Sequence, residues 1–126
     1  MAEGVAELTI DAPPDAVWAK IGDFGALAEI LPGIDSIRLE GNDRIIAMGD
    51  NEARERLLSR DDATRTLVYS VVEGMPVERH QATITVEAVG DGSKVTWAFE
   101  VEPADMATFL EDVYKGLLVN LDGLFS

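Results

Sequence analysis

The sequence predicts an α+β fold in which a curved antiparallel sheet of seven strands wraps around a long C-terminal helix, with two short helices between the first and second strands. Three observations support this class. Turn signals recur at short intervals, the segments between them alternate apolar and polar residues, and the C-terminal segment has the apolar periodicity of a helix. A chain of 126 residues has the length of one domain, so we expect residues 1–126 to form a single domain.

Glycine, asparagine and aspartate gather at regularly spaced turns after residue 40. These residues tolerate positive φ or hydrogen-bond to their own backbone, and they close hairpins. The turn signals are Gly41-Asn42-Asp43, Gly49-Asp50-Asn51, Asp61-Asp62, Glu73-Gly74-Met75-Pro76 and Gly90-Asp91-Gly92. The strands predicted between them, with one more near the N-terminus, are 4–11, 34–40, 44–48, 52–60, 64–73, 78–89 and 93–102.

Apolar and polar residues alternate along several of these strands. One-sided burial of an antiparallel sheet produces such alternation, because successive side chains point to opposite faces. In the last strand, Val95, Trp97, Phe99 and Val101 fall on one face. We expect this face of the sheet to look toward the C-terminal helix.

Two short helices fit between the first and second strands. Pro13-Pro14-Asp15 is typical of a helix start, since proline and an acidic residue suit the first turn. A second short helix is predicted from Ala26 to Leu31, where Pro32-Gly33 ends it.

The C-terminal segment after Pro103 has the clearest helical pattern. Its apolar stripe comprises Met106, Phe109, Leu110, Val113, Leu117, Leu121 and Leu124. A helix of roughly 20 residues is about 30 Å long and can cross the whole sheet. Gly116 is predicted to lie near this stripe, where it either lets a strand approach closely or leaves room for a ligand.

Charge and composition exclude several function classes. The net charge of −14 repels phosphate backbones, so nucleic-acid binding is disfavoured. Cysteine is absent and His80 is the only histidine, so no cofactor or metal is predicted. No signal peptide and no apolar run near 20 residues is visible, which predicts a cytoplasmic protein that does not insert into a membrane.

The N-terminal region carries an ordered set of residues that resembles a known family. The set comprises Pro13-Pro14, Val17-Trp18, Ile21, Asp23-Phe24 and Pro32-Gly33. It resembles the start of the polyketide cyclase/dehydrase-like branch of the START and Bet v 1-like (SRPBCC) superfamily. One departure is Ile30, where many relatives carry tryptophan, and it puts the shape of the pocket in question more than the fold.

The resemblance continues through the rest of the chain. The matching residues in the middle are Glu55, Leu57, Asp61, Leu67 and Tyr69, and VTWAFEVEP followed by a helix is similar to the family's last strand and helix. The resemblance implies a helix-grip fold with a hydrophobic cavity between sheet and helix. Members include lipid carriers, hormone receptors and aromatic polyketide cyclases, so the fold alone selects no chemistry.

Three polar residues share the expected inward parity of their strands. Glu55 shares a face with Leu57, and a carboxylate in a cavity could act as a general acid or base, or simply hydrogen-bond to a neighbour. His80 shares a face with Ala82, and it could accept a proton near pH 7 or sit at the edge of the core. Tyr69 could orient a ligand carbonyl or reach a backbone partner.

These residues lead to three alternative functions. The first is binding of a small hydrophobic or aromatic ligand, with Glu55 and His80 as the polar groups that hold the ligand in its orientation. The cavity would be lined by Leu57, Tyr69, Val71, Trp97, Phe99, Phe109, Val113 and Leu117. The second is a polyketide cyclase or dehydratase type of enzyme in which Glu55 or His80 moves protons. The third is a non-catalytic, homodimeric interaction domain.

Overall fold

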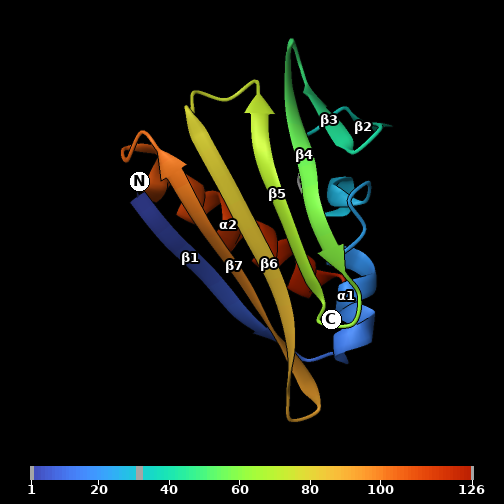
Figure 1. The fold of residues 1–126 in the computed structure, drawn as a ribbon. Helices are drawn as coiled ribbons and strands as arrows, with labels where there is room; N and C mark the ends of the chain where they lie inside the picture. The colour runs from blue at the N-terminus through green and yellow to red at the C-terminus, as the bar shows by residue number, and fades with distance from the viewer. Residues whose placement is uncertain (1, 31–32, 126) are drawn as a thin grey trace.

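The computed structural model describes residues 2–30 and 33–125. Seven strands form one antiparallel sheet in the order β1-β7-β6-β5-β4-β3-β2 (Figure 1). The strands are β1 (Ala2–Ile10), β2 (Ser36–Glu40), β3 (Asp43–Met48), β4 (Asn51–Asp61), β5 (Thr66–Glu73), β6 (Arg79–Val89) and β7 (Gly92–Glu102). The helices are α1 (Pro14–Ile21), the single 3₁₀ turn η1 (Leu27–Glu29) and α2 (Met106–Gly123). This arrangement confirms the predicted fold class.

The strand boundaries follow the predicted turns to within two residues. β5 begins at Thr66 rather than at residue 64, because Arg65 takes a positive φ of 50° in the preceding turn. The second predicted helix is reduced to the turn Leu27–Glu29. Leu31 and Pro32, at its predicted end, lie outside the described residues.

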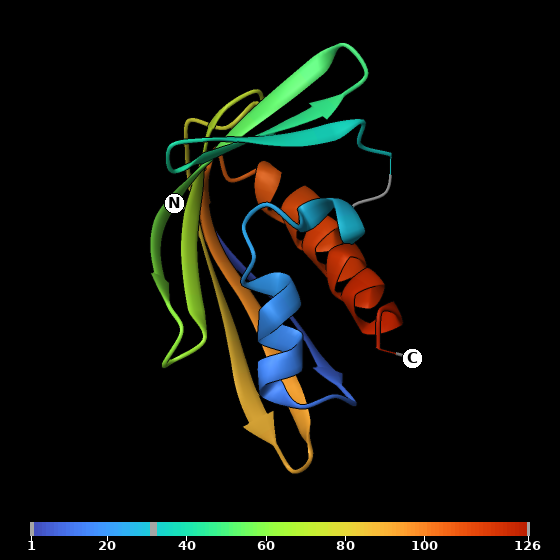
Figure 2. The same ribbon diagram turned by 90° about the vertical axis from the view of Figure 1, so that its right-hand side faces the viewer.

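The sheet curves around the helices. Figure 2 shows α1, η1 and α2 on one side of the sheet, with strands β2 to β4 bending over the start of α2. β4 has two register shifts against β5, between Arg54 and Glu55 and between Leu57 and Ser59. Bulges of this kind bend a strand and increase its twist. They place the bend beside Glu55.

The two neighbouring strands β5 and β6 separate at one end. Their ladder runs from the pair Thr66–Thr85 to the pair Tyr69–Ala82. At the next inward position the backbone N–H of Val71 donates to Nδ1 of the His80 side chain at 3.1 Å. A hollow of about 520 Å³ lies on the surface here, bordered by residues of both strands. His80 therefore lies at a split in the sheet.

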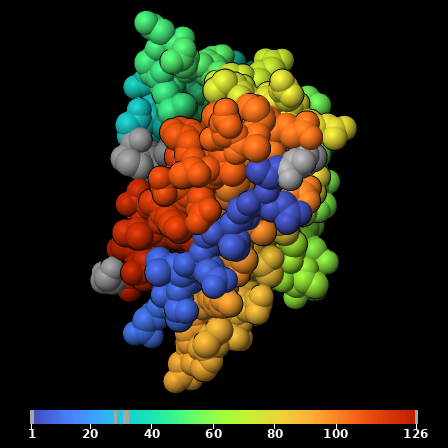
Figure 3. All heavy atoms as spheres, turned by 90° about the vertical axis from the view of Figure 1, so that its left-hand side faces the viewer, coloured from blue at the N-terminus to red at the C-terminus, as the bar shows by residue number. Residues whose placement is uncertain are grey.

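Helix α2 closes one side of the fold directly. Figure 3 shows it side by side with the edge strand β1, and these two elements contact each other closely. The inner face of β1 accommodates this packing with a small residue, because Gly4 lies under the ring of Phe99 and a Cβ there would clash with it. On the other side of the interior, α1 and η1 provide the cover (Figure 2).

The buried stripe of α2 differs from the predicted one. The side chains buried against the sheet are Leu110, Tyr114, Leu117, Leu118 and Leu121. Phe109 and Leu124, predicted to be in the stripe, are 53% and 41% exposed. Gly116 is also exposed, with open space where a Cβ would be. The helix is rotated so that Tyr114 and Leu118 face inward, because the ring of Tyr114 stacks on Trp97.

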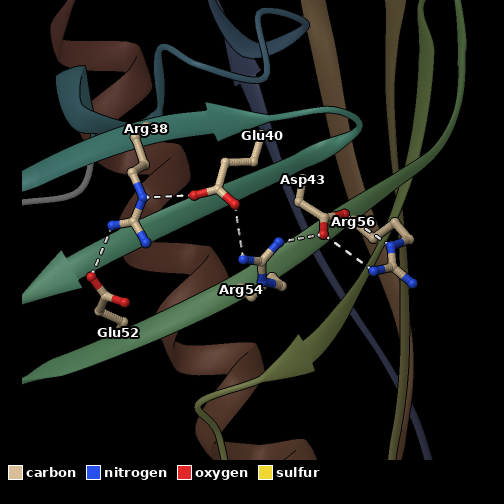
Figure 4. Close-up of polar contacts among 6 residues, drawn as sticks. All are labelled: Arg38, Glu40, Asp43, Glu52, Arg54 and Arg56. Carbon is tan, nitrogen blue, oxygen red and sulfur yellow. Dashed lines mark hydrogen bonds and ion pairs between the residues drawn. The ribbon is translucent and has the colours of Figure 1, made fainter.

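The outer face of β2, β3 and β4 carries a network of ion pairs (Figure 4). Asp43 accepts hydrogen bonds from Arg54 at 2.7 Å and from Arg56 at 2.9 Å. The chain of contacts continues through Arg54 to Glu40 and then through Arg38 to Glu52. Three arginines here balance three carboxylates, so this face is locally neutral in a strongly acidic protein.

No helix among residues 2–30 and 33–125 is long and apolar enough to cross a membrane.

Candidate functional site

A cluster of polar side chains lies inside the apolar core. Its members come from five elements that converge on the interior: Arg44 on β3, Glu55 on β4, Tyr69 on β5, His80 on β6 and Tyr114 on α2. All five are buried, and buried charged groups are rare unless they are paired. We take this cluster as the candidate site.

Arg44 and Glu55 form a buried ion pair across the β3–β4 hairpin. The two residues are direct partners in the ladder. The Nε and Nη2 atoms of Arg44 lie 2.7 and 2.6 Å from the same carboxylate oxygen, Oε1 of Glu55. Arg44 also donates from Nη1 to the carbonyl oxygen of Phe24 at 3.1 Å. The guanidinium is thus fixed in position by two hydrogen bonds and the ion pair.

Two aromatic rings flank the Arg44 guanidinium. Its carbon lies 4.0 Å from the ring centroid of Phe24 and 5.0 Å from that of Tyr69. A guanidinium over an aromatic face is attracted to the ring electrons, and the attraction is stronger where water is excluded. The interior of the fold therefore contains a preformed stacking position for aromatic groups.

His80 is held as a neutral imidazole of defined tautomer. Because Val71 N–H can only donate, Nδ1 of His80 must be the unprotonated nitrogen, and Nε2 carries the hydrogen. Nε2 lies 2.7 Å from the hydroxyl of Tyr114 and donates to it. Burial lowers the pKa of His80 to about 4. The ring is therefore uncharged at neutral pH.

Two tyrosines extend this hydrogen-bonded chain. The hydroxyls of Tyr69 and Tyr114 hydrogen-bond to each other, and Trp97 Nε1–H donates to the Tyr69 hydroxyl at 3.2 Å. Burial raises the pKa of both tyrosines above the ordinary value. Trp97 and Tyr114 stack with ring centroids 4.5 Å apart and an interplanar angle of 10°. These contacts fix the orientation of both hydroxyls.

Among the described residues, the space between α1, η1 and the sheet is small. A cavity of about 10 Å³ lies between α1, η1 and the sheet, which is room for about one water molecule. Its lining runs from Lys20, Asp23 and Glu29 at the surface to Arg44 and Trp97 inside. Along this lining the cavity implied by the family resemblance is therefore nearly filled, and a larger ligand placed there requires part of the interior to move.

Most of the predicted site residues face the interior. The fully buried ones are Glu55, Tyr69, Val71, His80, Trp97, Phe99 and Leu117. Leu57 and Val113 are partly buried and pack against the core. The predicted inward placement of Phe109 is wrong, because its side chain lies on the exposed side of α2. The role of each residue in binding or catalysis stays a prediction.

Sequence reasoning missed Arg44 and Tyr114. The turn at Gly49-Asp50 pairs Met48 with Asn51 and therefore, four residues further along each strand, Arg44 with Glu55. That register was readable from the sequence. Tyr114 lies four residues after Leu110 and four before Leu118, so helical spacing also marked it as a core position.

Within the part of the chain that the structure describes, no group of three or more His, Cys, Asp or Glu side chains is placed to hold a metal ion. The polar groups of the site hydrogen-bond to one another instead. The arrangement offers a fixed cation, a carboxylate and two hydroxyls beside aromatic rings.

Comparison with known proteins identifies relatives over the whole chain. A family model described as polyketide cyclase / dehydrase and lipid transport matches residues 1–125. The search of curated proteins gave no match.

Several solved structures share the fold. The protein XoxI from Bacillus cereus is 29% identical with a TM-score of 0.91, and the match covers 99% of this chain and 96% of that one. The di-domain ARO/CYC protein BexL from the BE-7585A biosynthetic pathway is 18% identical with a TM-score of 0.79, covering 98% of this chain and 46% of that one. Ara h 8.0201 is 23% identical with a TM-score of 0.77, covering 97% and 95%.

Proposed function

Because the chain belongs to the polyketide cyclase / dehydrase and lipid transport family, we propose that it binds a small hydrophobic or aromatic molecule between the sheet and α2. The whole of residues 1–126 would serve as one ligand-binding domain, acting in the cytoplasm. The observation that carries the proposal is the polar cluster inside an apolar interior. Apolar burial would supply the affinity, while Arg44, Glu55 and the two tyrosine hydroxyls would orient the ligand.

The cost of burying the cluster supports a role beyond stability. A buried ion pair is often no more stabilising than apolar residues of the same volume. Arg44 and Glu55 are nevertheless 4% and 7% exposed, and they lie beside His80, Tyr69 and Tyr114 rather than at the surface. Such an arrangement is typical of a site that recognises a polar group on a mostly apolar molecule.

The two tryptophans provide a direct test. Trp97 donates to Tyr69 inside the site, whereas Trp18 donates to Asp62, outside the polar cluster, at 2.9 Å. In ¹H–¹⁵N spectra, titration with 8-anilinonaphthalene-1-sulfonate and with fatty acids should shift the indole signal of Trp97 and leave that of Trp18 in place. Native mass spectrometry of the purified protein should reveal a small molecule that co-purifies. No bound mass, together with an unresponsive Trp97 signal, would contradict the proposal.

The enzymatic alternative rests on Glu55 and His80, which both face the interior. Both ring nitrogens of His80 are already engaged, by the backbone N–H of Val71 and by the hydroxyl of Tyr114, so Glu55 is the first residue to test for proton transfer. Turnover of a polyketide-like substrate that Glu55→Gln abolishes and His80→Gln preserves would support catalysis. If both variants turned the substrate over as fast as the wild type, neither residue would be a catalyst.

A further inference from the structure

The cover over the candidate site is a short stretch of chain with little regular structure. We call residues 24–30 the cover segment; it contains the single turn Leu27–Glu29. Phe24, Leu27 and Ile30 of this segment are buried and point into the interior. The segment belongs to no strand, so it has no ladder of hydrogen bonds to hold it down.

Polar contacts hold the cover segment near its two ends. Arg44 donates to the carbonyl oxygen of Phe24 at one end. At the other end, Asn120 of α2 donates from Nδ2 to the carbonyl oxygen of Ile30 at 2.7 Å. Lys20 of α1 and Glu29 form an ion pair at 3.1 Å, in which both side chains are more than 40% exposed. Exposed pairs of this kind contribute little to stability.

Phe24 occupies the position beside Arg44 that an aromatic ligand would need. Its ring centroid lies 4.0 Å from the guanidinium carbon, closer than that of Tyr69 at 5.0 Å. Tyr69 belongs to the sheet and is fixed by Trp97 and Tyr114, whereas Phe24 belongs to the cover segment. Of the two rings, Phe24 is therefore the one that can be exchanged.

The small cavity marks the path of that exchange. It borders the cover segment at Ala26, Leu27 and Ile30, and it reaches Arg44 inside. Its outer rim is formed by Lys20, Asp23 and Glu29, beside the exposed ion pair. Outward movement of the cover segment would join this cavity to the space that the Phe24 ring now fills.

We propose that Phe24 is an internal competitor for an aromatic-ring subsite on the Arg44 guanidinium, and that a flat aromatic ligand binds by displacing it with the cover segment. The inference rests on the proposed function and specifies its ligand class and the residue that sets its affinity.

Phenol and cyclohexanol form a matched pair of probes, because both carry a hydroxyl on a six-membered ring and only phenol is aromatic. In Phe24→Ala we expect phenol to bind about tenfold more tightly than in the wild type, since the subsite is vacated. Cyclohexanol should gain much less. Binding is followed by the Arg44 Nε–H and Trp97 Nε1–H signals, with the Trp18 indole as internal reference.

Phe24→Leu is the matched control, because leucine refills much of the space without presenting a ring. It should show no gain for phenol. If Phe24→Ala raised the affinity for phenol and for cyclohexanol equally, the empty volume alone would explain the gain. That result would overturn the proposal. An absent gain in a folded Phe24→Ala, checked by circular dichroism, would overturn it as well.

A second variant tests the same inference without altering the interior. Asn120→Ala removes the tie between α2 and Ile30 and should raise the affinity of phenol severalfold while the interior remains intact. Unchanged affinity there would contradict the displacement of the cover segment. If the wild-type Trp97 signal responds to 8-anilinonaphthalene-1-sulfonate while these variants show no gain, the proposed function stands and only the role of Phe24 falls.

Discussion

At His80, a backbone N–H occupies the ring nitrogen that an incoming proton would have to take. Val71 N–H points at Nδ1, so protonation there would bring two hydrogens face to face. On the other side, Nε2 is committed to the hydroxyl of Tyr114, whose own pKa is raised by burial. Local geometry and burial thus act in the same direction and keep the ring neutral.

The first prediction concerns the pH dependence that follows from this. The unfolded chain, with a histidine pKa near 6.5, binds more protons than the folded protein, whose His80 pKa is about 4. The free energy of unfolding should therefore fall as the pH is lowered from 6.5 to 4, by up to about 3 kcal/mol from this group. Urea unfolding at several pH values measures it, and His80→Gln should lose that part of the slope. An NMR titration that gives His80 a pKa near 6.5 would refute the prediction.

The second prediction concerns the buried ion pair. Removing one partner leaves an unpaired charge inside the fold, so Glu55→Leu should lower the free energy of unfolding by about 3–5 kcal/mol. The double variant Arg44→Met/Glu55→Leu should lose less than Glu55→Leu alone, because no charge is left unpaired. Urea denaturation of the wild type, both single variants and the double variant forms a complete cycle. Additive losses in that cycle would show that the two side chains do not interact.

At the scale of elements, the exposed face of α2 contains a glycine that no contact requires. Gly116 lies in the interior of the helix with open space around its missing Cβ. Gly116→Ala should therefore stabilise the protein by about 0.5–1 kcal/mol, because alanine loses less backbone entropy in a helix. The matched control is Gly4→Ala, which should destabilise because its Cβ meets the ring of Phe99. Melting temperatures that move in the same direction for both variants would contradict this assignment.

The outer face of β2 to β4 gives a prediction of its own, because its ion pairs join three strands at one edge of the sheet. Hydrogen bonds from Arg56 and Arg54 lower the pKa of Asp43 to about 2. This stabilisation is present above the unfolded pKa near 3.8 and is lost as the pH falls from 3.8 to 2. Asp43→Asn should lower the melting temperature at pH 7 and flatten its dependence on pH in that acid window. Asp91→Asn, in the exposed β6–β7 turn, should leave both unchanged.

At the scale of the whole molecule, short-range signals predicted the elements well. The strands are bounded by glycine, asparagine and aspartate turns, and period-two alternation identified the inner faces of β5 and β7, because both signals act within a few residues. The rotation of α2 could not be predicted in the same way. Apolar periodicity allowed Phe109 or Tyr114 to face inward, and the choice depends on stacking against Trp97, which is distant in the sequence.

The state of the candidate site was also beyond local reasoning. Strand parity placed Glu55, Tyr69 and His80 inside, but it did not predict how much free volume would be left between the interior side chains. That depends on where α1 and the cover segment pack, and those contacts join residues far apart in the chain, such as Arg44 to Phe24 and Asn120 to Ile30. The Arg44–Glu55 pair, by contrast, could be predicted, because the turn between β3 and β4 sets the register that places these two residues opposite each other.

The early end of the β5–β6 ladder divides the sheet into two panels along a seam. One panel comprises β1, β7 and β6 with α2 laid against it, and the other comprises β5 to β2. Past the pair Tyr69–Ala82, two hydrogen bonds of His80 join the panels. The backbone N–H of Val71 donates to the imidazole of His80, and the hydroxyl of Ser70 donates to the carbonyl oxygen of His80. At this end of the sheet, contacts of one histidine therefore do the joining that backbone pairs do along the rest of the seam.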